Sequence, residues 1–417
     1  MKKIGLSLFS IFLALQIVAQ EKSYFTNPVI RGDVPDPSVI RIEDTYYATG
    51  TSSEWAPFYP MFTSKDLVNW KQVGHVFTKQ PSWTSNSFWA PELFYHNNKV
   101  YCYYTARQKS TGISYIGVAT SDSPLHEFTD HGQIVEYGKE AIDAFIYDDN
   151  GQLYISWKAY GLDTRPIELL GCKLSADGLH LDGEPFTLLV DEKGIGMEGQ
   201  YHFKEGDYYY IVYAAHGCCG PSSDYDVYVA RARNYGGPYE KDPGNPILHG
   251  GEGDYKSCGH GTVVRTSDGR MFYMCHAYLK GDGFFIGRQP ILQEMEMTDD
   301  HWVRFKTGNL AIAEQPIPFV GTKQEPLSDF EDNFKGNQLK VDWTWNYPYS
   351  DIHAVLKKGK LFLSGTPKNN NKYGTALCLR PQSPQYSCET KVMNTGKGLK
   401  GLTLYGDDKN LIAWGIE

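Results

Sequence analysis

The sequence has no long run of basic or of acidic residues, although its 417 residues carry a net charge of −9. Nucleic-acid binding needs a concentrated basic face, so a nucleic acid is excluded as the main partner. The eight cysteines contain no CxxC spacing, which excludes the common zinc sites. No helical periodicity extends over a long stretch either. A neutral polymer is therefore the natural class of substrate.

The N-terminus has too short an apolar stretch to cross a membrane. This stretch begins at Ile4 and ends near Ala19, whereas a membrane helix needs about 20 apolar residues. Lys2 and Lys3 precede it, and a small residue lies near its end, which is typical of a secretory signal. We expect a signal peptide over residues 1–20, no membrane insertion, and a mature protein that is secreted or periplasmic.

Two of the cysteines, Cys218 and Cys219, are adjacent in the sequence. The expected compartment is oxidising, so disulfides are allowed there. Adjacent cysteines can pair only by distorting the peptide between them. A vicinal disulfide and two separate thiols or bridges elsewhere are therefore both open at this stage.

Five related segments recur along the chain. Each begins with a polar residue and a short apolar run, and continues through a turn into an aromatic-rich strand, which is the pattern of a β-hairpin. Third and fourth strands complete the unit. Four antiparallel strands repeated five times predict an all-β fold, a five-bladed β-propeller over residues 24–320, rather than an irregular β-sandwich. The segments start at Asp36, Glu92, Asp143, Glu198 and His260, at intervals of 51 to 62 residues.

The geometry of a propeller brings these five starts together. The first strand of each blade lines the central channel, so equivalent positions converge near the axis. Four carboxylates and one imidazole would then share a single region. Unpaired buried charge is costly, so such a ring indicates catalysis, a metal ion or both.

The motifs around these starts resemble those of glycoside hydrolase family 43. The resemblance implies inverting hydrolysis of glycans that contain arabinose or xylose, with catalytic carboxylates at Asp36, Asp143 and Glu198. Gly199 is followed by Gln200 where many relatives have proline. The motifs that carry the resemblance are Gly32 to Ser38, Trp89 to Leu93, Ile142 to Ala144, Met197 to Gly199, Gly259 to Gly261 and Gly287-Arg288.

Inverting hydrolysis defines the expected roles. One carboxylate deprotonates water and one carboxylic acid protonates the leaving oxygen, with the two groups about 6.5–9.5 Å apart. We assign Asp36 as the general base and Glu198 as the general acid. Asp143 is expected to raise the pKa of the acid by like-charge repulsion and to orient it. Asp33 is a rival base, for which a turn role before Pro35 is favoured.

Substrate contacts are expected from three further residues. Trp89 is either a sugar platform or a core residue, and Glu92 either bonds the substrate or packs the blade. Arg288 resembles the active-site arginine of the family, which would bind a substrate hydroxyl and a catalytic carboxylate together; the alternative is a surface cation.

One metal site is suggested by the resemblance. His260 resembles an axial histidine that in some members faces a calcium ion through water molecules. Calcium prefers oxygen ligands, so a structural calcium ion and a hydrogen-bonded histidine without metal both remain open. The chemical step requires no cofactor.

The pattern changes after Pro326. Alternating strands over residues 327–417 resemble the start of a lectin-like β-sandwich that is appended to some β-xylosidases of the family. The segment is shorter than that module usually is, so we expect a partial or reduced β-sandwich. Walling the active site, binding glycan and stabilising the propeller are all open as its role.

The leading hypothesis is an enzyme that releases terminal sugars, a β-xylosidase or an α-L-arabinofuranosidase acting on plant cell-wall polysaccharides or oligosaccharides. An endo-1,5-α-L-arabinanase is the alternative, because the loop over residues 216–220 resembles that of arabinan-cleaving relatives. A non-catalytic glycan-binding propeller is the third hypothesis. The sequence does not choose between the two sugars or give the oligomeric state.

Overall fold

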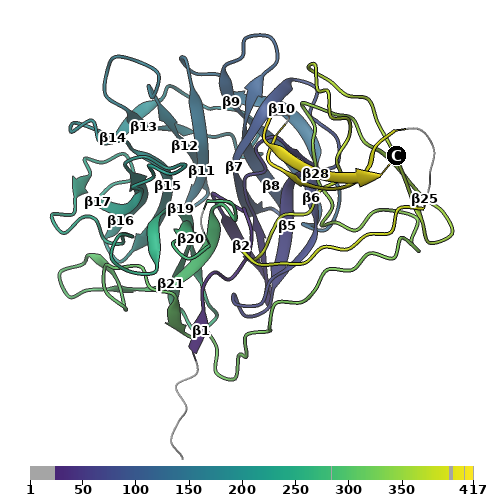
Figure 1. The fold of residues 1–417 in the computed structure, drawn as a ribbon. Coiled ribbons are helices and arrows are strands. Elements are labelled where there is room, and N and C mark those ends of the chain that lie inside the picture. Colours follow the sequence, from purple (N-terminus) through teal and green to yellow (C-terminus); the bar gives the residue numbers. More distant parts are fainter. Residues whose placement is uncertain (1–23, 283, 394–397, 408, 417) are drawn as a thin grey trace, which may run out of the picture.

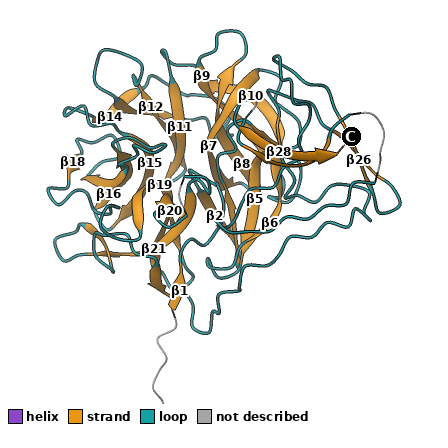
Figure 2. Ribbon diagram, viewed as in Figure 1, coloured by secondary structure: helices purple, strands orange, loops and turns teal. Residues whose placement is uncertain are grey.

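The computed structural model describes residues 24–282, 284–393, 398–407 and 409–416. The predicted signal peptide lies outside these ranges. Within them the regular structure consists of β-strands (Figure 2), and no helix there is long and apolar enough to span a membrane.

Five four-stranded antiparallel sheets are arranged in a ring (Figure 1), which confirms the predicted five-bladed propeller. From the inside outward, the first two blades consist of β2 (Ser38–Ile42), β3 (Thr45–Thr49), β5 (Phe58–Ser64) and β6 (Lys71–Phe77), then β7 (Thr84–His96), β8 (Lys99–Gln108), β9 (Ser114–Ser121) and β10 (Thr129–Val135). The third consists of β11 (Ala141–Asp149), β12 (Gln152–Ala159), β13 (Glu168–Lys173) and β14 (Phe186–Val190). The last two are β15 (Glu198–Glu205), β16 (Tyr208–Ala215), β17 (Asp226–Ala232) and β18 (Glu240–Lys241), then β19 (Tyr255–Arg265), β20 (Met271–Leu279), β21 (Gln289–Met297) and β22 (Val303–Phe305).

The ring closes between the fifth and the first blade. Strand β1 (Tyr24–Thr26) pairs with β23 (Glu314–Pro316), which joins the start of the propeller to its end. Nearer the axis, the Thr262 hydroxyl donates a hydrogen bond of 3.0 Å to the Pro37 carbonyl. The central channel is therefore surrounded by protein on all sides.

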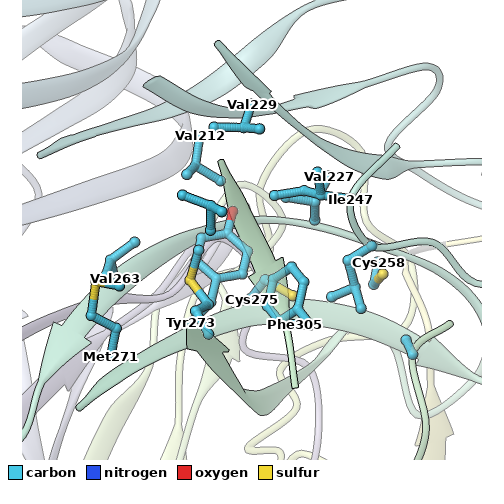
Figure 3. Packing of buried hydrophobic residues seen from close by; sticks show 14 of the residues in the cluster. Val212, Val227, Val229, Ile247, Cys258, Val263, Met271, Tyr273, Cys275 and Phe305 are labelled. Atoms are coloured by element: carbon cyan, nitrogen blue, oxygen red, sulfur yellow. The ribbon is translucent and has the colours of Figure 1, made fainter. Parts of the chain in front are cut away.

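Hydrophobic side chains fill the space between neighbouring blades. Between the fourth and fifth blades, Val212 and Val227 belong to the same buried cluster as Tyr273 and Phe305 (Figure 3). Side chains alternate between the two faces of a strand, so the aromatic-rich second strands pack against both neighbouring blades. This packing fixes the angle between blades and with it the position of the residues at the axis.

The chain beyond residue 326 lies against the first two blades (Figure 1). Strand β24 (Trp345–Asn346) pairs with β4 (Trp55–Ala56) of the first blade, and the Tyr347 hydroxyl donates to the Ser85 carbonyl at 2.7 Å. The other strands form two separate hairpins, so a sandwich stays a prediction. These hairpins are β25 (His353–Leu356) with β26 (Leu361–Ser364), and β27 (Lys400–Tyr405) with β28 (Leu411–Ile416).

Candidate active site

One residue at the start of each blade has a left-handed backbone. In the second to fifth blades it lies at a β-bulge between the first and second strands, and in the first blade it precedes β2. Non-glycine residues adopt this conformation rarely and at an energetic cost. It therefore marks one level around the channel. The five residues are Asp36 (φ 55°), Ala90 (40°), Asp143 (59°), Gly199 (61°) and His260 (47°).

The positions of these five residues correct the alignment of the five predicted repeat starts. Three of the five predicted starts lie at these positions, but those of the second and fourth blades do not. Glu92 lies two residues beyond Ala90, and Glu198 lies one residue before Gly199. A bulge inserts a residue into one strand without changing the polar and apolar pattern around it, so the pattern gave no sign of where it falls.

The backbone N–H at four of these positions is bound by a side chain of the preceding blade. Each bulge takes the N–H out of the strand ladder, so it needs another acceptor when buried. The blades are thus connected one to the next at the level of the ring. The four pairs are Asp36 with His276 Nδ1 (3.1 Å), Ala90 with Thr51 Oγ1 (2.7 Å), Asp143 with Thr105 Oγ1 (3.2 Å) and Gly199 with Asp143 Oδ2 (3.1 Å).

Asp36 is buried among groups that favour its charged form. The Thr51 hydroxyl donates to its Oδ2 at 2.6 Å, and Arg288 Nη1 donates to its Oδ1 at 3.3 Å. His276 Nδ1 and His260 Nδ1 lie 3.1 and 3.5 Å from Oδ1. Burial alone would raise the pKa of Asp36, but Arg288 and, after it, His260 hold it well below its usual value. Asp36 is therefore a carboxylate at neutral pH.

Asp33 supports this arrangement from outside the ring. Its Oδ1 accepts a hydrogen bond of 2.8 Å from the Arg288 backbone N–H. A Cβ atom on Gly287 would lie 2.3 Å from the same oxygen, so only glycine allows this approach. Arg380, from the C-terminal segment, donates to the Asp33 carbonyl at 3.3 Å. The contacts of Asp33 fit a role in holding the loop that carries Arg288, and the C-terminal segment contributes to that support.

Glu198 lies opposite a lysine that the sequence did not point to. Lys158 Nζ is 2.7 Å from Glu198 Oε2 and 3.8 Å from Glu140 Oε2, and the Tyr225 hydroxyl donates to Glu198 Oε1 at 2.9 Å. Burial, the largest single influence, raises the pKa of Glu198. Lys158, His260 and Tyr225 together lower it by more than that, so the net pKa falls below its usual value. The expected net rise in the pKa of Glu198 is therefore not found, because Lys158, His260 and Tyr225 together outweigh burial and the like charge of Asp143.

Asp143 connects the two sides of the site. Its Oδ2 lies 3.9 Å from His260 Nδ1, the same nitrogen that lies near Asp36. Burial raises the pKa of Asp143 to about 7, and the neighbouring Glu198 adds to this effect. Groups that interact this strongly titrate as a pair. At neutral pH the Asp143–Glu198 pair thus holds up to one proton, which rests mainly on Asp143.

Four of the groups that shape the site were missed from the sequence: Lys158, Tyr225, His276 and Thr51. Lys158 gave a usable sign, because it is the one charged residue in the otherwise uncharged strand β12. Tyr225 comes just before β17 and Thr51 just after β3, whereas His276 lies within β20. The contact of His276 with Asp36 depends on how neighbouring blades are set around the axis. Nothing in the local sequence indicates the contacts of these three residues.

Trp89 takes the place in the second blade that Glu198 takes in the fourth, one residue before the left-handed position. It is half-buried, and the Arg107 guanidinium lies 5.9 Å from the centre of its ring. A half-buried indole at this level leaves part of its surface open to a ligand. Its role as a sugar platform stays a prediction.

Glu92 lines a small cavity on the axis, which is also bordered by Asp36, Ala90 and His260 of the ring but not by Trp89 or Arg288. Burial raises the pKa of Glu92 to about 8, so it is mainly uncharged at pH 7. The structure does not bring Glu92 together with the other predicted substrate-binding residues. Residues at the same level of all five blades line this cavity: Ser38, Glu92, Phe145, Tyr201 and Thr262.

The same cavity is where an axial calcium ion would lie, since His260 and Gln200 also line it. The donor atoms suit calcium, because the buried Gln200 Oε1 has no hydrogen-bond partner among the described residues. The cavity volume of about 10 Å³ holds about one water molecule. Calcium needs six to eight oxygen ligands, so an ion with its waters does not fit this conformation.

Known glycosidases are similar to this chain over most of its length. A Vibrio xylan 1,3-β-xylosidase is 28% identical over 415 residues, covering 91% of this chain and 76% of its own. The Bacteroides ovatus non-reducing end α-L-arabinofuranosidase BoGH43B is 28% identical over 431 residues, covering 97% and 78%. The crystal structure of the GH43 protein BlXynB from Bacillus licheniformis superposes with a TM-score of 0.73 at 25% identity, covering 86% and 72%.

The sequence profile of the glycosyl hydrolases family 43 matches residues 25–303. This range contains every residue of the ring and all five blades except the last two residues of β22. The chain is a member of that family.

Proposed function

We propose that this enzyme removes single xylose or arabinofuranose units from the ends of plant cell-wall polysaccharides or oligosaccharides, with inversion at the anomeric carbon. The observation that carries the proposal is the ring itself. Asp36, a carboxylate at neutral pH, lies in one site with Asp143 and the neighbouring Glu198, a carboxyl pair that holds a proton near neutral pH. We propose these two sugars because the relatives reported above are a xylosidase and an arabinofuranosidase. The predicted signal peptide supports a location outside the cytoplasm.

Asp36 is the general base in this proposal. Its pKa lies well below its usual value, so it is ready to accept a proton from water at any physiological pH. Arg288 holds the carboxylate and has further donors for a sugar hydroxyl. His260 lies between Asp36 and Asp143 and fixes the distance between them.

Glu198 is the general acid. It has the more accessible side chain of the pair, with 18% exposed against 8% for Asp143, so it is the one that can reach a glycosidic oxygen. The reacting form has the single proton of the pair on Glu198. Because Lys158 stabilises the ionised form, this is the minor form of the free enzyme. Asp143 acts as the group that holds the proton and positions Glu198 through the Gly199 backbone.

Lys158 should set the alkaline limb of the pH profile. The value of kcat/KM is expected to fall as pH rises through about 7, where the pair loses its proton. Lys158 lowers the pKa of both acids. In Lys158→Met both values rise, so the alkaline limb should move to higher pH. Profiles measured beside Lys139→Met, which removes an exposed cation paired with Asp163, test this. An unmoved limb in Lys158→Met would contradict the assignment.

Removal of metal ions should leave the reaction intact. Every proton transfer proposed above uses a side chain, and the axial cavity has room for about one water molecule. After treatment with EDTA we expect kcat to stay within about twofold and the midpoint of thermal unfolding to stay the same. A loss of stability that calcium restores and magnesium does not would instead place an ion at the axis.

The function is tested by measuring hydrolysis of aryl xylosides, aryl arabinofuranosides and linear arabinan. NMR spectroscopy then shows which anomer of the product forms first. The proposal expects a single pentose released with inverted configuration. Early release of oligomers from arabinan would favour the endo-arabinanase. Retained configuration would remove the assignment of Asp36 as a base, and binding without turnover would indicate a non-catalytic propeller.

A further inference from the structure

We propose that the Cys218–Cys219 disulfide and the aromatic residues beside it form the binding surface for the leaving sugar. The inference rests on the proposed function and adds the second half of the substrate site. It concerns the loop over residues 216–225, between β16 and β17. Cys218 and Cys219 are joined by a disulfide, which settles the question that the sequence left open. Cys218 is half-buried and Cys219 is exposed.

The loop is attached to the general acid at both of its ends. Ala214, two residues before the loop, is the strand partner of Glu198. Tyr225, which closes the loop, donates a hydrogen bond to Glu198 Oε1. The acid must protonate the oxygen of the leaving group, so the leaving sugar has to lie beside Glu198. The disulfide belongs to the loop that these two contacts join to Glu198, and Cys219 is exposed there.

The loop is held so that the disulfide has a fixed position. The Ser223 hydroxyl lies 3.0 Å from the Gly217 and Cys218 carbonyl oxygens and 2.7 Å from the Ser257 hydroxyl. Asp224 accepts from the Gly217 N–H at 2.8 Å. The vicinal disulfide closes a small ring with the peptide bond between the two residues. A fixed surface loses little entropy when a ligand binds to it.

The loop also reaches the side of the site that carries the base. The Gly220 N–H donates to the Tyr278 hydroxyl at 3.0 Å, and the Tyr278 ring packs edge-on against Phe284 at 4.9 Å. The Phe284 carbonyl accepts a hydrogen bond of 3.1 Å from the N–H of Gly287, the residue before Arg288. Phe284 is 41% exposed. A continuous border therefore runs from the general acid, Glu198, to Arg288, which binds the general base. It consists of the disulfide, Tyr278 and Phe284.

This border extends into the C-terminal segment. Phe285 stacks on Tyr386 at 6.5 Å, and the two are 57% and 50% exposed. Large apolar side chains left exposed in a group usually mark a binding surface. Sulfur and aromatic rings are polarisable and offer no strong hydrogen-bond donors, so they suit the C–H face of a sugar ring. The occupant that fits is the next pentose of an oligosaccharide.

The test compares two substrates that differ only in the leaving group. A pentosyl fluoride has no ring on the leaving side, whereas a disaccharide does. The pairs are β-xylosyl fluoride with β-1,4-xylobiose, or the corresponding arabinofuranosyl compounds. In Cys218→Ser/Cys219→Ser, the ratio of kcat/KM for disaccharide to that for fluoride should fall about tenfold, the effect of losing about 1.4 kcal/mol of transition-state binding. Reducing the wild-type disulfide with a phosphine should cause the same fall, and reoxidation should reverse it.

Phe284→Ala provides a second variant in a different loop with the disulfide intact, and it should lower the same ratio. An equal loss on both substrates would overturn the inference, because it would mean that the disulfide only holds Tyr225 in place. An unchanged ratio in both variants would overturn it too. If the wild-type enzyme hydrolysed neither substrate, the proposed function would fail, and that result is distinct from a change of ratio.

Discussion

Asp36→Asn should lower kcat/KM by about 10³-fold or more on every substrate, since the reaction then lacks the group that deprotonates water. The loss should not depend on the leaving group, because the base acts on water and not on the departing oxygen. Asparagine is the right replacement, since it is one of the few residues that adopt a left-handed backbone readily, as φ 55° requires. The fold should therefore survive the substitution.

The measurement is kcat/KM on an aryl pentoside together with the midpoint of thermal unfolding. Asp44→Asn is the matched control, because Asp44 lies in the first hairpin of the same blade, is exposed and pairs only with surface groups. It should retain full activity. If Asp36→Asn kept near-normal activity while folded, Asp36 would not be the base, and Asp143 would become the candidate.

Glu198→Gln should produce a loss that depends on the leaving group. Glutamine cannot donate a proton to the departing oxygen, so poor leaving groups such as sugars should slow by about 10²- to 10⁴-fold. A dinitrophenolate leaves without protonation, so its glycoside should slow far less. A plot of log kcat against the pKa of the leaving phenol should therefore become steeper in the variant.

Glu205→Gln is the matched control for this series. Glu205 is the last residue of the same strand β15, and it pairs with Arg265 at the surface. Its plot should coincide with that of the wild type. If Glu198→Gln slowed all glycosides by the same factor, Glu198 would orient the substrate rather than donate the proton, and the proton would have to come from Asp143.

The fold could be predicted from the sequence because the signal is repeated five times. Each hairpin is a weak indication, but five at similar intervals leave few alternatives. The same repeat placed Asp36, Asp143 and His260 correctly. It failed by one or two residues at Glu198 and Glu92, since the alternation of polar and apolar residues continues through a bulge.

The electrostatics of the site could not be predicted in this way. The pKa of Glu198 depends on Lys158 and Tyr225, which lie 40 residues before it and 27 residues after it in the chain. Lys158 reaches Glu198 from the third blade, so that contact follows from the angle between blades, whereas Tyr225 comes from the β16–β17 loop of the same blade as Glu198. A ring of acids can be recognised from the sequence, but which acid holds the proton depends on contacts between blades.

The left-handed backbone of the five residues around the channel also limits which substitutions the enzyme can tolerate. Valine, isoleucine and threonine fit poorly there, because a branched Cβ clashes with such a backbone. At residue 199 no side chain fits at all, since a Cβ would lie 2.5 Å from the His260 ring. Selection for folding alone would thus favour aspartate, asparagine, histidine or glycine at these places. In a screen of random variants, hydrophobic replacements at Asp36 and Asp143 should be lost as unfolded protein, so their inactivity would carry no information about catalysis.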